Sequence, residues 1–174
     1  NGTSKATEPS LTLTVGETFS DTFIYTTQTG DAPAVNLNVS SANDTATRTT
    51  TVQEPALFDV TIDDVNNTVT EGDQIAVDYT VKNTGDLQDT QDIEFTVNGT
   101  SEATKSSLTL TGGETASNTF TYSTQTGDAP AVELNVSSAN DSAIRTITVQ
   151  EPAFFDVTID DINNTVTEDD QIAV

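Results

Sequence analysis

Apolar and polar residues alternate in short runs along the chain, most clearly in its central part. In residues 58–62 (Phe-Asp-Val-Thr-Ile), every second residue is apolar, which is typical of a β-strand with one buried face. Similar alternation recurs in six further runs, at residues 75–81, 93–97, 108–110, 120–122, 132–136 and 147–149. The pattern predicts seven short strands, with a particularly short one at residues 108–110, and no helix.

Segments rich in Gly, Asn and Asp separate these runs and predict turns. Residues 63–74 are expected to form a polar turn, and Gly85 is available for a positive φ in the next one. Asn98-Gly99 is a strong signal for a tight hairpin, and Gly113 and Gly127 mark later turns. Because each strand offers one apolar face, two sheets must pack those faces together. The sequence therefore predicts an all-β fold, a seven-stranded immunoglobulin-like (Ig-like) β-sandwich.

Aromatic residues lie on the apolar faces of these strands. Their alternation favours a role in the core over a ligand-binding platform. The five expected to bury the most area are Phe58, Tyr79, Phe95, Phe120 and Tyr122.

The chain repeats itself with a period of 97 residues. Residues 1–77 align with residues 98–174 without a gap, and 62 of the 77 aligned pairs are identical. A close tandem repeat predicts one folded module per copy. We therefore divide the chain into residues 1–57, the C-terminal part of a repeat with four of its seven strands, residues 58–153, a complete repeat, and residues 154–174, the first strands of a following repeat.

The incomplete copies have two interpretations. In the first, the chain is part of a longer tandem array, in which neighbouring repeats are complete. In the second, residues 154–159 of one molecule complete residues 1–57 of the next by β-strand complementation, which produces a head-to-tail polymer. The second interpretation is incomplete, because nothing in the chain replaces the segment between Asp78 and Val97.

One difference between the copies exchanges two charges. Lys5 and Glu8 in the first copy become Glu102 and Lys105 in the second. Since a pair of opposite sign is kept, we expect the two residues to lie close together across a turn. An exposed pair of this kind contributes about 0–1 kcal/mol.

A second difference concerns apolar residues. Phe19 and Ile24 of the first copy become Ala116 and Thr121. Because Ile24 lies on the face opposite Phe23, we expect it to point outward and hypothesise that the first copy packs this face against a neighbour. If so, Ile24→Thr should weaken assembly or stability.

The chain is strongly acidic, with 28 acidic and 5 basic residues and a net charge of −23. Self-repulsion at this density disfavours a compact state unless salt screens it. The Debye length falls from roughly 8 Å at physiological ionic strength to roughly 3 Å in molar salt. The composition is typical of a halophilic protein and disfavours nucleic acid as a partner. Disordered acidic chains have a similar composition, but regular apolar alternation argues against disorder here.

Two segments resemble the CARDB-type Ig-like repeats of secreted prokaryotic proteins. They are EGDQIAVDYTVKNTGD (residues 71–86) and SLTLTGGET (residues 107–115), which share the apolar alternation, the Asn-Thr-Gly turn and the Gly-Glu-Thr turn. The acidic bias is similar to that of haloarchaeal surface versions. The resemblance covers the whole unit and implies a seven-stranded sandwich that serves in adhesion or as a spacer, without catalytic residues. The incomplete copies at both ends depart from the pattern.

Asn-x-Ser/Thr sequons occur in pairs that lie one repeat apart. Such sequons are N-glycosylation acceptors on the surface of secreted proteins. The eight are Asn1, Asn38, Asn43, Asn66, Asn98, Asn135, Asn140 and Asn163.

Carboxylates cluster around the turn between the first two predicted strands. Oxygen-rich turns suit Ca²⁺, although none here has the spacing of a known calcium motif. Acidic turns are also expected throughout a chain of this charge. The candidate ligands are Asp63, Asp64 and Asp73 in one copy and Asp160, Asp161, Asp169 and Asp170 in the next.

Catalysis has little support from the sequence. The chain has no His and no Cys, which excludes Ser-His-Asp triads, thiol nucleophiles, disulfides and His- or Cys-based zinc sites. No apolar run approaches the 18 or so residues of a membrane span. We expect no cofactor other than the Ca²⁺ considered above.

These observations favour a non-enzymatic repeat of an extracellular fibre, filament or surface-layer protein. Its expected partners are further copies of itself, joined head to tail, and glycans. The alternative is an adhesion or carbohydrate-binding spacer module of a larger secreted protein, which exposed aromatics in a loop cluster would favour. A secreted hydrolase would need catalytic residues outside this segment.

Overall fold

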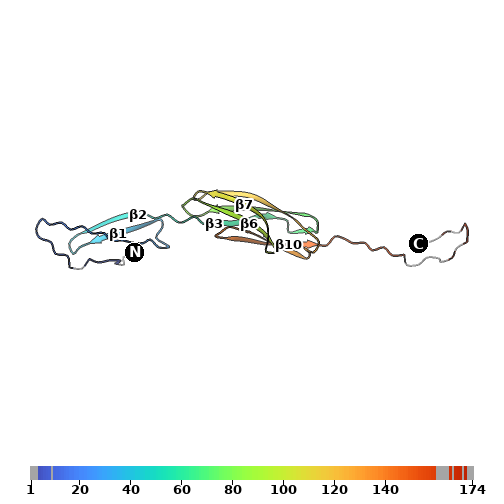
Figure 1. The fold of residues 1–174 in the computed structure, drawn as a ribbon, viewed down its shortest axis with the longest axis horizontal. Helices are drawn as coiled ribbons and strands as arrows, with labels where there is room; N and C mark the ends of the chain where they lie inside the picture. The colour runs from blue at the N-terminus through green and yellow to red at the C-terminus, as the bar shows by residue number, and fades with distance from the viewer. Residues whose placement is uncertain (1–3, 9, 160–164, 166, 170, 172–174) are drawn as a thin grey trace.

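The computed structural model describes residues 4–8, 10–159, 165, 167–169 and 171, and all regular elements among them are β-strands (Figure 1). The strands are β1 (Ala34–Ser40), β2 (Thr45–Thr51), β3 (Phe58–Val65), β4 (Thr68–Thr70), β5 (Gln74–Asn83), β6 (Asp89–Val97), β7 (Thr100–Leu110), β8 (Thr115–Ser123), β9 (Ala131–Ser137) and β10 (Ser142–Gln150).

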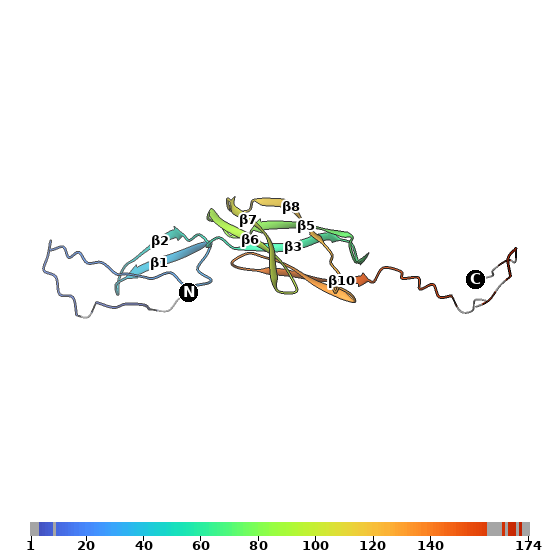
Figure 2. The ribbon, with the colours of Figure 1, turned by 45° about the vertical axis from the view of Figure 1, so that its right-hand side comes forward.

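Strands β3 to β10 form a sandwich of two sheets (Figure 2). One sheet has the order β4-β10-β9-β6-β7 and the other the order β3-β5-β8. Neighbours pair antiparallel except β4 and β10, which are parallel. Alternate residues of both sheets, for example Ile75 and Val77 in β5, join one core. This confirms the predicted all-β, Ig-like sandwich.

The core is built from the residues whose alternation predicted the strands. Three aromatic rings stack within it. Phe120 lies between Tyr79 and Phe95, with ring-centroid distances of 4.7 Å and 5.2 Å. Phe58 is also fully buried, whereas Tyr122 is half-buried and packs against the edge of the core. Four of the five predicted core aromatics are therefore in the core, and the fifth borders it.

The complete copy has eight strands rather than seven. The predicted polar turn at residues 63–74 contains β4, a strand of three residues whose Val69 is buried beside Val149 of β10. The strand predicted at residues 108–110 is not short. It extends back to Thr100, because the whole of β7 pairs with β6.

Two glycine predictions had different outcomes. The Asn98-Gly99 hairpin is confirmed, since both residues have positive φ, 49° and 78°, and connect β6 to β7. Gly85 is not among the residues with positive φ. It is required for another reason: a Cβ at this position would lie 1.9 Å from the carbonyl oxygen of Pro55.

In the first copy, β1 and β2 pair with each other (Figure 1). The prediction of four strands in residues 1–57 is wrong for the described part, where the counterparts of β7 and β8 are not regular strands. In the complete copy these two strands pair with β6 and β5, which have no counterpart within residues 1–57. The described residues of 154–174 likewise form no strand.

The predicted charge pair does not lie across a turn. Glu102 and Lys105 are both within β7, and both side chains are exposed. In the first copy, the Lys5 ammonium lies over the ring of Tyr25, 5.7 Å from its centroid. The exchange of charges between the copies therefore does not indicate a direct contact, because exposed positions on a strand tolerate either charge.

Candidate interaction surface

The turn between β9 and β10 binds the outer edge of β3 through polar groups. Phe58 N–H donates to Asn140 Oδ1 (3.2 Å), and Val60 N–H donates to Asp141 Oδ2 (2.9 Å). Ser138 Oγ donates to the carbonyl oxygen of Phe58 (2.8 Å). The Val60 N–H, together with the N–H of Ser142, holds the pKa of Asp141 below its usual value. This turn therefore recognises the backbone of a strand, in one register.

A second contact connects the β4–β5 turn to the loop between β8 and β9. Glu71 Oε1 accepts hydrogen bonds from the N–H groups of Gly127 (2.8 Å) and Ala129 (3.2 Å). The same loop is stiffened by Asp128, whose Oδ2 accepts from the Tyr122 hydroxyl (2.9 Å) and from Gln125 N–H (2.7 Å). One carboxylate thus fixes the loop internally, and another attaches it to β4.

The linker between the two copies, residues 54–57, is bound to the β5–β6 loop. Glu54 N–H donates to Asp86 Oδ2 (2.9 Å), and Asp86 N–H donates back to the Glu54 carbonyl (3.1 Å). Thr84 N–H donates to the Leu57 carbonyl (2.8 Å). Gly85 allows the Pro55 carbonyl to approach closely. The joint between the copies is therefore a set of defined contacts rather than a free tether.

The first copy keeps the polar turn, and among the described residues no strand lies against it. Residues 41–44 have the same sequence as residues 138–141 and the same internal bonds. Asp44 N–H donates to Ser41 Oγ (3.1 Å), where Asp141 N–H donates to Ser138 Oγ at 3.0 Å. Among the described residues, Asn43 Oδ1 and Asp44 Oδ2 accept no hydrogen bond.

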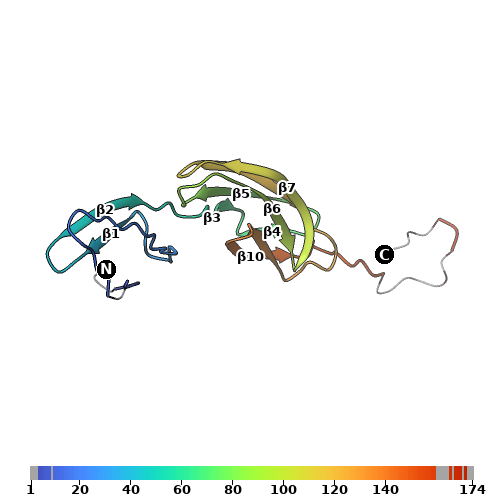
Figure 3. The ribbon, with the colours of Figure 1, turned by 60° about the vertical axis from the view of Figure 1, so that its left-hand side comes forward.

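Residues that are core in the complete copy are exposed in the partial ones. Val39 is 56% exposed, whereas its counterpart Val136 is fully buried. Val157 in the tail is 87% exposed, whereas its counterpart Val60 is 4% exposed. Figure 3 shows the β1–β2 hairpin and the segment that follows β10, residues 151–159, on opposite sides of the sandwich. The chain therefore carries an uncovered sheet face and, separately, an apolar segment of the kind that covers such a face.

Ile24, which the sequence predicted to point outward, is 86% exposed, and its counterpart Thr121 is also exposed. This orientation is confirmed. The contact of Ile24 with a neighbour stays a prediction.

The structure does not gather the carboxylates predicted to bind Ca²⁺. Asp63 accepts from the hydroxyl of Thr80 (2.6 Å), and Asp73 accepts from Thr70 N–H (3.0 Å) within a turn. Over the described residues, no group of three or more Asp or Glu side chains is placed to hold a metal ion. Asp64 lies opposite Asp78 in the strand pairing, and Asp169 is exposed. Asp160, Asp161 and Asp170 lie outside the described residues.

Most predicted glycosylation sites in the described part are on the surface. Asn38, Asn43, Asn66, Asn98 and Asn140 are exposed. Asn135 is half-buried in β9, and its Oδ1 is covered and without a partner. Asn1 and Asn163 lie outside the described residues. Occupancy stays a prediction for all eight.

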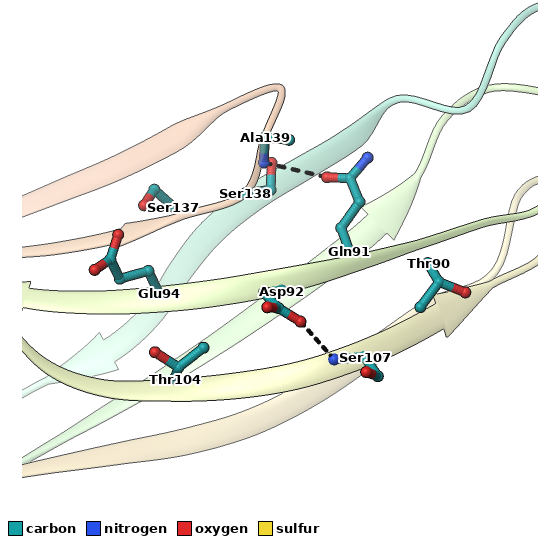
Figure 4. Close-up of a pocket in the computed structure, with 9 residues that line it drawn as sticks. All are labelled: Thr90, Gln91, Asp92, Glu94, Thr104, Ser107, Ser137, Ser138 and Ala139. Atoms are coloured by element: carbon teal, nitrogen blue, oxygen red, sulfur yellow. Dashed lines mark hydrogen bonds between the residues drawn. The ribbon is translucent and has the colours of Figure 1, made fainter.

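A polar hollow of about 700 Å³ lies beside β6, β7 and the β9–β10 turn (Figure 4). Ser and Thr side chains dominate its lining, with the carboxylates of Asp92 and Glu94. Asp92 Oδ1 accepts from Ser107 N–H (2.7 Å), and Gln91 Oε1 accepts from Ala139 N–H (3.2 Å). The first bond joins β6 to β7 at an irregularity in their pairing, and the second joins β6 to the β9–β10 turn. None of the lining side chains is paired as an acid with a base or nucleophile. None of the described segments is a helix able to span a membrane.

Sequence reasoning missed the strand-binding turn as a site. Asn140 was predicted only as a glycosylation site, and no role was predicted for Asp141. The available signal was the identity of residues 41–44 and 138–141 between the copies. None of these four positions is a core residue, so their identity is not explained by apolar packing.

The packed sheets define the complete copy as an Ig-like β-sandwich, joined to a partial copy of its own sequence. No family model and no curated protein matches the chain.

Solved structures with a similar fold include the CARDB domain of a Pyrococcus furiosus protein in complex with di-metal ions. It is 14% identical with a TM-score of 0.49, and the match covers 57% of this chain and 96% of that domain. A solution structure of the same organism's CARDB domain is 18% identical with a TM-score of 0.44, covering 55% of this chain and 94% of that domain. A β-glucosidase from Listeria innocua is 16% identical with a TM-score of 0.45. That match covers 55% of this chain and only 16% of the enzyme. Likenesses at this level assign no function.

Proposed function

We propose that this chain is a non-enzymatic structural repeat of an extracellular fibre, filament or surface layer, in which Ig-like units join end to end. The observation that carries the proposal is the joint at residues 54–57. Four consecutive residues of the linker make backbone or side-chain contacts with the β5–β6 loop of the next unit. Such contacts keep successive units in line, which a structural polymer requires and a flexible spacer does not.

The same linker sequence recurs one repeat later. Residues 51–56 (TVQEPA) are identical to residues 148–153. We expect the second linker to bind the next unit in the same way, since the groups that make the joint are supplied by the repeat itself. The acidic surface suits a protein that works outside the cell in concentrated salt, where its charge is screened.

The absence of a catalytic role rests on chemistry. The chain offers no His or Cys, and in the polar hollow beside β6 and β7 the Asp92 carboxylate is engaged with a backbone N–H group while Glu94 stands alone. General acid–base catalysis needs a positioned pair with separated pKa values.

The rival function is an adhesion or carbohydrate-binding spacer. Sugar-binding and other ligand sites use exposed aromatic platforms in a concave surface. Residues 58–153, all of which the structure describes, expose no aromatic side chain. The complete copy therefore lacks the feature that would favour the rival, and the exposed aromatic side chains of the chain lie in its partial copies.

Electron microscopy of the native protein in molar salt tests the proposal. We expect linear or helical polymers with a regular globular period along the axis. Discrete particles that bind immobilised glycans, without polymers, would contradict the proposal and favour the rival.

A further inference from the structure

We propose that residues 154–159 of one molecule, the donor strand, dock onto the first copy of a second molecule and are held by a polar latch. The latch consists of Ser41, Asn43 and Asp44, with the N–H groups of Gly30 and Ala32. This inference rests on the proposed end-to-end assembly and names the groups that carry it.

The complete copy is the template for this contact. Each donor-strand residue stands 97 positions after its β3 counterpart, so that Phe155 and Val157 correspond to Phe58 and Val60. In the complete copy, the N–H groups of these two β3 residues donate to Asn140 and Asp141. The equivalent acceptors in the first copy are the side chains of Asn43 and Asp44.

The latch is already formed before any strand binds. Asn43 N–H and Asp44 N–H donate to Ser41 Oγ at 3.3 and 3.1 Å, and Thr45 N–H donates to Asp44 Oδ1 at 2.8 Å. The remaining oxygens point to no partner among the described residues. A site that is ordered in advance loses little conformational entropy on binding.

A second contact lies one loop away. Glu168 of the tail corresponds to Glu71, whose carboxylate accepts from Gly127 and Ala129 in the complete copy. The corresponding N–H groups in the first copy are those of Gly30 and Ala32. Their loop is held by the same bond, from the Tyr25 hydroxyl to Asp31 Oδ2 (2.8 Å). One tail therefore has two matching contacts on the first copy.

The residues that differ between the copies favour the donor strand, rather than the strands and loops of a whole repeat, as the segment that binds the first copy. Gly112, which lies against the backbone of Asp86 in the β5–β6 loop, is Val15 in the first copy. Ala116, which pairs with Val81 of β5, is Phe19. The latch residues are the same in both copies. The two residues whose counterparts contact β5 and the β5–β6 loop have larger side chains in the first copy. The first copy thus suits a β3-like strand that arrives without the β5–β6 loop of the complete copy.

Apolar burial supplies the driving force. Phe155, Val157 and Ile159 are 86%, 87% and 66% exposed, whereas their counterparts in β3 are at most 5% exposed. Leu37 and Val39 form the exposed face that would receive them, since their counterparts Leu134 and Val136 share the core with β3. Burying both surfaces removes apolar area from water on each molecule.

Sedimentation velocity of the whole chain in molar salt tests the inference, over about 0.01–1 mM protein, where interfaces of modest size associate. We expect concentration-dependent, head-to-tail association. Asp44→Ala should weaken it about tenfold by removing a charged acceptor of a backbone N–H. Val157→Asp should weaken it by about a hundredfold or more, because it places a charge on the buried face of the donor strand.

Asp21→Ala is the matched control. Asp21, like Asp44, is an exposed acid of the first copy that accepts from the next residue's N–H, here Thr22 at 2.7 Å. Both substitutions remove one negative charge, which by itself favours association, so only Asp44→Ala should weaken it. Because Val157 lies outside the first copy, its variant tests the contact even if Asp44→Ala perturbs the hairpin.

Two outcomes would overturn the latch. One is a chain that stays monomeric over the whole range. The other is that the Asp44→Ala and Val157→Asp variants associate as strongly as the Asp21→Ala control. In either case, end-to-end assembly of longer native arrays is decided independently by the microscopy described above.

Discussion

Asn83 satisfies four backbone groups from a fully buried position. Its Oδ1 accepts from Leu57 N–H (3.2 Å) and Gly85 N–H (3.1 Å), and its Nδ2 donates to the carbonyls of Leu87 (2.7 Å) and Leu110 (3.1 Å). Sequence reasoning assigned this residue only to a turn, because an Asn-Thr-Gly segment looks the same whether its side chain is buried or solvated.

Asn83→Ala should therefore lower the free energy of unfolding by about 3 kcal/mol or more, since buried polar groups left unsatisfied cost about 1–3 kcal/mol each. Urea unfolding in molar salt measures the change. A loss below about 1 kcal/mol, the net value of a single ordinary hydrogen bond, would contradict this role.

Tyr79 is the contrasting core residue, because its hydroxyl is buried without a hydrogen-bond partner. The ring stacks on Phe120, and a Phe ring would keep that contact. Tyr79→Phe should leave stability unchanged or raise it by about 1 kcal/mol, because it removes an unsatisfied polar group. The same urea titration measures this, and a clear loss of stability would reveal a bound water or another partner for the hydroxyl.

Tyr122 makes stability depend on alkaline pH. Burial, reinforced by the hydrogen bond and negative charge of Asp128, raises the pKa of Tyr122 from 10.0 to about 12. A group whose pKa is higher in the folded than in the unfolded state stabilises the fold. This contribution is complete at pH values below the pKa of the unfolded state and is lost as the pH rises through the pKa of the folded state. We expect the melting temperature to fall between about pH 10 and 12. In Tyr122→Phe the fall should be smaller, although Tyr25 and Tyr79, whose pKa values are also raised, keep part of it.

At the scale of elements, alternation predicted seven of the eight strands of the complete copy, although it found only the last three residues of β7. It missed β4, because three residues with one buried Val give no recognisable period. It also predicted strands at the counterparts of β7 and β8 in the first copy, where the local turns are kept but the pairing strands are absent. Alternation shows which face of a segment can be buried. Whether the segment becomes a strand depends on a partner elsewhere in the chain.

The same limit applies to the joint and the latch. Both consist of side chains that bind backbone groups distant in sequence, such as Asp86 with Glu54 and Asp141 with Val60. No local pattern predicts such a partner. Repetition between the copies marks Glu54 and Asp141, whereas Asp86 occurs only once in the chain and carries no such signal.

Gly85→Ala should disrupt the joint. Its Cβ would lie 1.9 Å from the Pro55 carbonyl oxygen, a backbone atom that cannot rotate away. We expect a loss of about 1–3 kcal/mol, typical of overpacking, and faster hydrogen exchange at the Thr84 amide that bonds Leu57.

Thr84→Ala is the control for this variant. It removes only the hydroxyl bond to the Leu57 carbonyl (3.2 Å) at an exposed position and should cost less than about 1 kcal/mol. Equal effects of the two substitutions would show that close approach at Gly85 is not what holds the linker.

For the whole molecule, charge sets the conditions for folding. The net charge is −23, and even within the sheet Asp64 lies opposite Asp78, a like-charged pair that destabilises a strand pair unless it is screened. Dialysis from molar into millimolar salt should abolish the β-sheet circular dichroism, and returning the salt should restore it. Retained structure at low salt would contradict the halophilic interpretation.

The parallel pairing of β4 with β10 gives the sandwich a direction in which it resists being pulled apart. The chain enters at β3 and leaves after β10 at the opposite end (Figure 1). Tension along a string of such units therefore acts along the strands, and the bonds between Thr68–Thr70 and residues 148–150 must break together in shear rather than one after another. Under such tension a unit of this kind yields only when the whole patch of bonds between β4 and β10 breaks at once.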